Sequence, residues 1–541
     1  MRHILTFCVA FVLITFFALF STFIGETTDV LQMRERNLAI SFNTVGEELI
    51  MSWKPFQYPC VYKVETLSET TGLVPNSPRY HLLKSAETVT ASYTLPHAPI
   101  PTYYSISARG IFNEIFKSKV AMANPNFPIP PHPMPIFHYT ANNPASLMPF
   151  LIWHTVPNAV CYEVEILSAP PEIEGDILPS KLYHLESTTK IFTNGYQADL
   201  RPYKENYSVV YWRARALGLH KEPIGEFSNA EPIYIDANLP LPNAPLINNF
   251  DFMNYEQLPM YPVYNWIPIN GAVKFEVELS TRKSYDVGEN PDALWRKVTA
   301  DLGSCYDDFR RPAGVYFWRV RGLDAEDKPI GTWSEAEKFI VEDFSGGVKA
   351  AIFGDSISHG GGAVSYSPRS LEYSYATYID FPVINLSRSG DTAHTTLERF
   401  ENDVLPFKPK NLIISTGANS LRDASITAEN IISDLTQIMN LCKRNDIRPI
   451  FLTLMPVNPA NIKYAFRIDT DPHWHEKLIT VNSFIKGTEY FIDIEPYFYD
   501  DAGEMNSKLC VDGIHPDLNG KMIIGEIINQ NRHLFRDVAN Q

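Results

Sequence analysis

The chain has 541 residues, a formal charge of −16 and an apolar content of 45%. This length predicts several domains rather than one, and the apolar share is sufficient for well-packed cores. Because nucleic-acid binding needs concentrated lysine and arginine, the acidic balance argues against a nucleic-acid partner.

The N-terminus has the composition of a targeting segment. Arg2 and His3 precede an apolar run over residues 4–24, which is the layout of a secretory signal. The run is also about long enough to span a bilayer, and a small residue is missing two positions before Gly25. Cleavage of residues 1–25 and their retention as a membrane anchor therefore both stay open. Either outcome predicts that the rest of the chain is extracytoplasmic, as a secreted, periplasmic or surface-anchored protein.

A threefold repeat precedes the C-terminal part. In each unit a tryptophan is followed nine residues later by an aromatic residue that opens an alternating run, and period-two alternation predicts a half-buried strand. The pairs are Trp53 and Tyr62, Trp153 and Tyr162, and Trp266 and Phe275. An arginine-containing strand follows in each unit, at Arg109, Arg215 and Arg321. This pattern resembles fibronectin type III domains, so we expect immunoglobulin-like β-sandwiches at 34–124, 134–236 and 240–342.

Two functions are open for these repeats. Proline-rich joints at residues 125–135 and 240–245 favour semi-rigid spacers. Patterned aromatic residues usually belong to a core, which also favours the spacer interpretation. The alternative is that one repeat binds carbohydrate through exposed aromatic side chains.

The cysteines form no metal-binding or redox motif. Apart from Cys8 in the apolar run, five cysteines are scattered without a CxxC pair: Cys60, Cys161, Cys305, Cys442 and Cys510. This spacing favours small apolar core residues. A bridge between Cys442 and Cys510 stays open, and no metal or cofactor is expected.

From Val348 onward, short apolar runs alternate with helical ones. The predicted strands are Val348–Phe353, Pro382–Leu386, Asn411–Ser415, Pro449–Leu454 and Tyr490–Ile494. Helical periodicity is clearest over residues 427–444 and again after Asn519. This alternation predicts a doubly wound parallel sheet over residues 347–541, with its active site at the carboxyl ends of the strands.

A serine with a base partner is the strongest chemical signal in that region. Ser356 follows the first predicted strand in Gly-Asp-Ser, and a serine hydroxyl needs a neighbouring base to become nucleophilic. His515 is the natural base. Asp512, three residues earlier, is placed to orient the imidazole.

The same region supplies donors for an oxyanion. The backbone N–H groups of Ser356 and Gly390 and the side-chain amide of Asn419 all follow predicted strands. Ser358 and His359 are expected to line the pocket or to brace the turn.

Four blocks of this sequence resemble the SGNH (GDSL-type) hydrolases. They are Gly354-Asp-Ser-Ile357, Ser389-Gly-Asp391, Gly417-Ala-Asn419 and Asp512-Gly-Ile-His515. The resemblance implies a flavodoxin-like three-layer α/β/α fold and metal-independent hydrolysis of acyl esters. It also implies Ser356 as nucleophile, Asp512 and His515 as the rest of the triad, and Gly390 and Asn419 as oxyanion donors. Ser420 stands where the third block often has aspartate, which puts the bracing of the asparagine loop in question.

These features predict an exported serine esterase that acts on an acylated small molecule or polysaccharide. Removal of O-acetyl groups from a carbohydrate polymer is the favoured case. Two alternatives stay open. One is a surface glycan-binding or adhesion protein with a secondary or inactive hydrolase domain, and the other is an O-acyltransferase that uses the same triad.

Overall fold

The computed structural model describes most of the chain. The described ranges are 2–32, 39–45, 48–96, 102–123, 132–249, 260–283, 290–301, 303–344, 346–363 and 366–538. Residues 34 and 124, the predicted ends of the first repeat, lie outside them, as do the prolines of the first joint up to residue 131. The chain forms two compact units, Met1–Thr70 with Pro78–Ile129, and Thr71–Ser77 with Pro130–Gln541.

The first unit begins with a long apolar helix, α1 (Arg2–Gln32). Its segment Phe11–Val30 is long and apolar enough to cross a membrane, with a mean hydropathy of 1.6, and a signal sequence would pass the same test. Near its end, the buried Glu26 accepts the backbone N–H groups of Ile111 and Phe112 at 2.7 and 3.0 Å. The choice between a cleaved signal and a retained anchor stays a prediction.

Two antiparallel sheets complete the first unit. One has the order β1-β2-β5, and the other has the order β4-β3-β6-β7 with β8 against β6. Their strands are β1 (Ser41–Val45), β2 (Glu48–Ser52), β3 (Val61–Glu69), β4 (Tyr80–Thr88), β5 (Ser92–Pro96), β6 (Thr102–Arg109), β7 (Glu114–Lys117) and β8 (Ala121–Ala123). Met51 of β2 and Val64 of β3 are buried in one shared core, so the two sheets pack together.

The second unit repeats this arrangement twice. Sheets β13-β10-β9 and β12-β11-β14-β15, with β16 against β14, are followed by β17-β18-β21 and β20-β19-β22-β23, with β24 against β22. The first group comprises β9 (Met134–Pro135), β10 (Phe150–His154), β11 (Cys161–Leu167), β12 (His184–Ile191), β13 (Gly195–Gln197), β14 (Val209–Leu217), β15 (Pro223–Ile224) and β16 (Glu231–Tyr234). The second comprises β17 (Leu246–Ile247), β18 (Val263–Ile267), β19 (Lys274–Ser280), β20 (Trp295–Thr299), β21 (Ser304–Tyr306), β22 (Gly314–Leu323), β23 (Pro329–Ile330) and β24 (Glu337–Val341).

The repeated aromatic residues are core residues at equivalent places. Ring centroids are 5.2 Å apart for Trp53 and Tyr62, 5.3 Å for Trp153 and Tyr162, and 5.2 Å for Trp266 and Phe275. All six side chains are buried. The N-terminal region is therefore rich in β-sheet, as predicted. The assignment of three fibronectin type III-like sandwiches, and the domain boundaries, stay predictions.

A five-stranded parallel sheet forms the core of the C-terminal domain. Its order is β26-β25-β27-β28-β29, with β25 in register between β26 and β27. The strands are β25 (Ala350–Gly354), β26 (Ile384–Asn385), β27 (Asn411–Ser415), β28 (Arg448–Leu452) and β29 (Phe491–Ile492). β25 and β27 are buried throughout, which explains their continuous apolar runs. The prediction of an α/β domain with a parallel sheet is confirmed.

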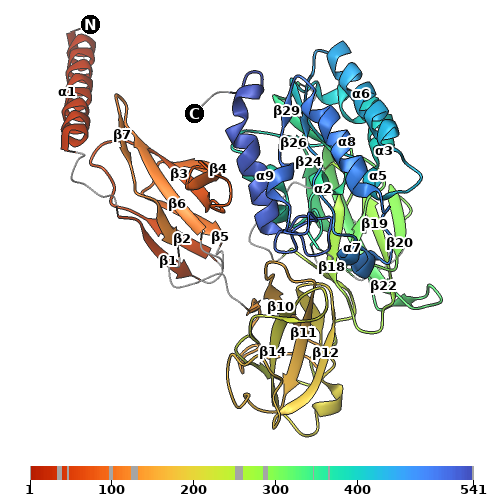
Figure 1. Ribbon diagram of the computed structural model, residues 1–541. Coiled ribbons are helices and arrows are strands. Elements are labelled where there is room, and N and C mark those ends of the chain that lie inside the picture. Colours follow the sequence, from red (N-terminus) through yellow and green to blue (C-terminus); the bar gives the residue numbers. More distant parts are fainter. Residues whose placement is uncertain are drawn as a thin grey trace. The chain divides into compact units, whose positions relative to one another are not determined.

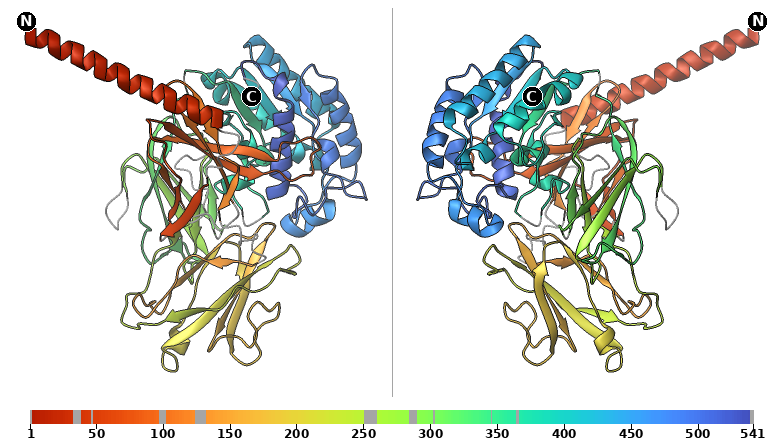
Figure 2. Two further views of the ribbon diagram at one scale, coloured as in Figure 1. Left: turned by 90° about the vertical axis from the view of Figure 1, so that its left-hand side faces the viewer. Right: turned by 90° about the vertical axis from the view of Figure 1, so that its right-hand side faces the viewer.

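Helices cover both faces of this sheet. They are α2 (Ser356–His359), α3 (Ala393–Glu398), α4 (Phe400–Asp403), α5 (Ala418–Arg422), α6 (Ala428–Arg444), α7 (Pro459–Phe466), α8 (Trp474–Lys486) and α9 (Leu518–Gln530), with short 3₁₀ turns η2 (Leu371–Tyr373) and η3 (Tyr375–Tyr378). α9 packs against η2 and η3 on one face, while α6 contacts both α3 and α8 on the other (Figures 1 and 2). The domain therefore has three layers, and the carboxyl ends of its strands form one edge.

The five scattered cysteines are buried free thiols. Cys442 and Cys510 are not bridged, and both lie in the core of the C-terminal domain. Cys442 and Cys510 are therefore small apolar core residues, as predicted from the sequence.

Candidate active site

Ser356 lies just past the carboxyl end of β25, which pairs with β26 on one side and β27 on the other. Asp355 caps the short helix α2, and its carboxylate accepts the backbone N–H of Ile357 at 3.1 Å. Gly354 has no room for a side chain, since a Cβ there would lie 1.9 Å from the carbonyl oxygen of Ser415 on β27. This close approach of two strands makes the turn sharp, and it leaves Ser356 as the first residue of α2.

The structure brings Ser356, His515 and Asp512 into one hydrogen-bonded chain. His515 Nε2 is 2.9 Å from Ser356 Oγ, and His515 Nδ1 is 2.8 Å from Asp512 Oδ2. A carboxylate can only accept, so Nδ1 carries the proton and Nε2 is free to accept the serine proton. This is the geometry that a serine nucleophile needs.

Asp512 is buried and held in its charged form. Its Oδ1 accepts the backbone N–H groups of Ile514 at 2.9 Å and His515 at 2.8 Å. Burial alone would raise the pKa of Asp512, but the electrostatic interaction with His515 and the hydrogen bonds outweigh burial, and the pKa lies below its ordinary value. The carboxylate is therefore ionised at neutral pH.

Gly390 and Asn419 lie on either side of Ser356 along the sheet edge. Gly390 follows β26, and Asn419 follows β27, the two strands that flank β25. Gly390 has a φ of +89°, and no atom lies within 4 Å of a Cβ built on it. Glycine is therefore required there by the backbone conformation, and its surroundings are open.

The side-chain amide of Asn419 has a fixed orientation. Its Nδ2 donates to the carbonyl oxygen of Asp391 at 2.9 Å, and its Oδ1 accepts from Arg422 at 2.7 Å. An amide nitrogen has two N–H groups, so one remains for a substrate. Ser420 stands where similar sequences often have aspartate. Its Oγ accepts the backbone N–H of Ala393, the first residue of α3, at 3.0 Å, and this bond connects the asparagine loop to α3.

Two arginines that support the site were not among the predicted residues. Arg422 lies three residues after Asn419 on α5, a helical spacing that could have indicated it. Arg399 is buried and pairs with Asp391 at 2.6 Å and with Asp403. Local spacing could not show that Arg399 also donates to the carbonyl oxygen of Gly354 at 3.3 Å.

The buried Asp355 makes a testable contribution to stability. Burial raises its pKa from the ordinary 3.8 to about 6. A raised pKa stabilises the fold below pH 3.8, and this contribution is lost as the pH rises through about 6. We expect wild type to gain stability relative to Asp355→Asn as the pH falls from about 8 to about 4. Thermal unfolding of both proteins across this range measures the difference, and a constant difference would contradict the assignment.

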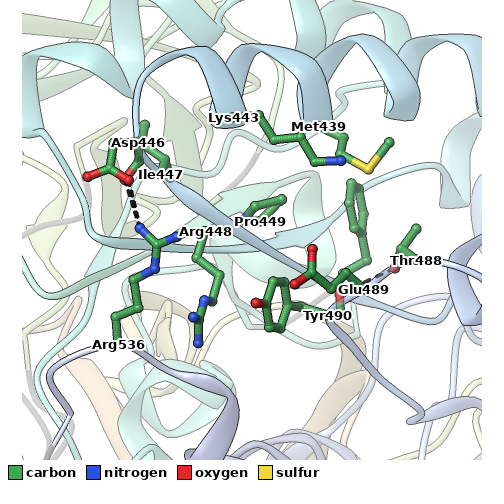
Figure 3. Close-up of a pocket in the computed structure, with 11 residues that line it drawn as sticks. Met439, Lys443, Asp446, Ile447, Arg448, Pro449, Thr488, Glu489, Tyr490 and Arg536 are labelled. Carbon is green, nitrogen blue, oxygen red and sulfur yellow. Dashed lines mark hydrogen bonds and ion pairs between the residues drawn. The ribbon is translucent and has the colours of Figure 1, made fainter.

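A separate pocket of about 180 Å³ lies at the opposite edge of the sheet (Figure 3). It includes Arg448, the first residue of β28, whose guanidinium stacks over the ring of Tyr490 at 4.3 Å. Arg536 pairs there with Asp446 at 2.9 Å. None of the residues that line this pocket is serine, cysteine or histidine.

One comparison with known proteins matches part of this domain to a family, and another finds similar solved structures. Residues 352–523 match the GDSL-like Lipase/Acylhydrolase family. A lipase/acylhydrolase from Enterococcus faecalis is 22% identical over 36% of this chain and 100% of its own, with a TM-score of 0.29. A GDSL-like lipase from Bacteroides thetaiotaomicron is 20% identical over 34% and 87%, with a TM-score of 0.29. A catalytic mutant of an acetylxylan esterase from Geobacillus stearothermophilus is 18% identical over 36% and 98%, with a TM-score of 0.27. No curated protein matches the chain.

Proposed function

We propose that the GDSL-like acylhydrolase domain of this chain is an exported serine esterase in which Ser356 attacks the carbonyl carbon of an acyl ester. The observation that carries the proposal is the chain of hydrogen bonds from Ser356 Oγ through His515 to Asp512, at 2.9 and 2.8 Å. Ser356 is 9% exposed, so its hydroxyl is mostly shielded from bulk water.

Acylation begins when His515 Nε2 takes the proton from Ser356 Oγ as the oxygen bonds to the ester carbon. The tetrahedral intermediate collapses, and the alcohol leaves with the proton that His515 returns to it. Water then attacks the acyl-enzyme, again losing its proton to His515. The second intermediate collapses as His515 returns this proton to Ser356 Oγ, which releases the acid and restores the free enzyme, so atoms and protons balance over the cycle.

Asp512 keeps the imidazole in the tautomer that each of these steps needs. Its buried, ionised carboxylate faces Nδ1 at 2.8 Å and also stabilises the imidazolium that forms in each transition state. The two backbone N–H groups on the other carboxylate oxygen stop the side chain from rotating away.

The negative oxygen of the intermediate is assigned to three donors, the backbone N–H groups of Ser356 and Gly390 and the free N–H of Asn419. Removal of one such donor typically costs about 3–4 kcal/mol of barrier, because these donors are fixed before charge develops. Asn419 is held at both ends of its amide, which suits this role.

The favoured substrate is an O-acetyl ester on a carbohydrate polymer outside the cytoplasm. An apolar N-terminal helix and a β-rich region ahead of the catalytic domain support export and a large extracellular substrate. Residues 4–24 are proposed to tether the protein to a membrane where they are not removed.

Acetate release from acetylated xylan and from p-nitrophenyl acetate tests this function. We expect the full-length protein, kept in detergent, to release acetate from both without added metal. The same assay with an unacetylated oligosaccharide present separates water from sugar as the acyl acceptor. Acetyl transfer in place of acetate release would make the protein an O-acyltransferase, and the absence of both products would contradict the proposal.

A further inference from the structure

His359, the last residue of α2, uses both ring nitrogens in buried hydrogen bonds. Its Nδ1 accepts the backbone N–H of Ser389 at 3.2 Å and lies 2.8 Å from Ser389 Oγ. Its Nε2 lies 2.8 Å from the main-chain oxygen of Tyr261. A backbone N–H can only donate and a carbonyl can only accept, so Nδ1 is unprotonated and Nε2 carries the proton. The partners therefore fix one neutral tautomer, and burial lowers the pKa of His359 to about 4.

Tyr261 and Tyr306, which both lie against His359, come from the β-rich part of the second unit. Tyr261 precedes β18, and its hydroxyl donates to Asp403 at 2.7 Å. Tyr306 ends β21, and burial raises the pKa of its hydroxyl to about 12 while the neighbouring Ser389 side chain lowers it, so the two hydroxyls lie near each other. The Tyr306 ring also lies edge-on to His359, with centroids 6.2 Å apart. These β-rich sheets therefore contact His359, three residues after Ser356, and the segment that leads into Gly390.

Ser389 directly precedes Gly390, whose amide is an assigned oxyanion donor. On the other side of Gly390, Asp391 is held by Arg388 and Arg399, both at 2.6 Å. Gly390 itself has open surroundings and the conformational freedom of glycine. The direction of its N–H is therefore set by how firmly its two neighbours are held.

We propose that His359 is a positioning residue which, held by Tyr261 and Tyr306, aims the Gly390 amide at the oxyanion. The β-rich sheets around β18 and β21 are then a working part of the catalytic apparatus rather than a spacer. This inference rests on the proposed esterase function, because it concerns a donor for the same intermediate.

Kinetics of two variants test the inference. Tyr306→Phe removes only the hydroxyl near Ser389, and His359→Leu removes all three hydrogen-bond contacts of the imidazole. A displaced oxyanion donor predicts a fall in kcat of about 10–100-fold with KM changed by less than about threefold. Because boronic acids form a tetrahedral adduct on serine, the inhibition constant of phenylboronic acid should rise by about the same factor as kcat falls.

A matched control and a rescue variant separate positioning from general stability. Tyr316→Phe removes a tyrosine hydroxyl that donates to the carbonyl of Pro312 at 2.8 Å within the same β-rich region, and it should leave kcat unchanged. His359→Asn keeps an acceptor near Ser389 and should recover part of the activity that His359→Leu loses. If His359→Leu does not fold, Tyr306→Phe still decides the question.

The outcomes distinguish the two proposals. An inactive wild type would overturn the esterase function itself. An active wild type with folded Tyr306→Phe or His359→Leu variants at full kcat would overturn the positioning role alone. Equal losses in kcat for Tyr306→Phe and Tyr316→Phe, together with lowered thermal midpoints, would also overturn it.

Discussion

The Ser356→Ala variant should lose about four orders of magnitude or more in kcat and keep its fold. Ala removes the oxygen that bonds to the acyl carbon, and the oxyanion donors alone leave only residual catalysis. The hydroxyl contributes little to folding, because its hydrogen-bond partner is the imidazole of His515 at the rim of the site. The measurement is kcat for p-nitrophenyl acetate, with circular dichroism and a thermal midpoint to show the fold.

Ser425→Ala is the matched control, since this exposed serine bonds only locally, to Asp423 at 2.6 Å. It should retain full activity. A Ser356→Ala protein that hydrolyses the ester as fast as wild type would mean that the nucleophile lies elsewhere.

Asp512→Asn should lower kcat by about 10⁴-fold at neutral pH, as in serine triads generally. The amide oxygen of Asn can still accept the backbone N–H groups of Ile514 and His515, so the turn is preserved. The amide N–H₂ then faces Nδ1 of His515, which must accept, and the proton moves to Nε2. In that tautomer the imidazole cannot take the proton of Ser356.

Asp512→Asn should also lower the free energy of unfolding at neutral pH. The pKa of Asp512 is lowered in the folded protein, so its contribution to stability is present at neutral pH and is lost as the pH falls through that pKa. Asp501→Asn, at an exposed position, controls for loss of a carboxylate. Activity of Asp512→Asn within tenfold of wild type would contradict the orienting role.

Central strands were predicted better than edge strands, for a physical reason. β27 was predicted as Asn411–Ser415 and is observed there, because a strand paired on both sides is buried along its whole length and has a continuous apolar centre, here Leu412–Ile414. The edge strand β26 is only Ile384–Asn385, whereas Pro382–Leu386 was predicted. In an edge strand the apolar run continues beyond the last hydrogen bond to the neighbouring strand. The predicted strand is therefore longer than the observed one.

The start of a helix was also predicted correctly where the sequence has a capping residue. Residues 427–444 were predicted as a helix, and α6 runs over Ala428–Arg444 with Thr427 as its N-cap. The Thr427 side chain accepts the backbone N–H of Asn430, a local bond that depends on residues three apart.

The sequence by itself determined the parallel α/β domain, the order of its chemical groups and the identity of Ser356, Asp512 and His515 as candidates. Those conclusions rest on periodicity and on spacing within short segments, which the chain carries locally. Only the tertiary structure decided that Ser356 Oγ lies 2.9 Å from His515 Nε2, across 159 residues of sequence. It alone showed that His359 and the carbonyl of Tyr261, 98 residues apart, meet beside Ser389 and Gly390. Such contacts depend on how separate elements pack, and that packing cannot be predicted from local composition.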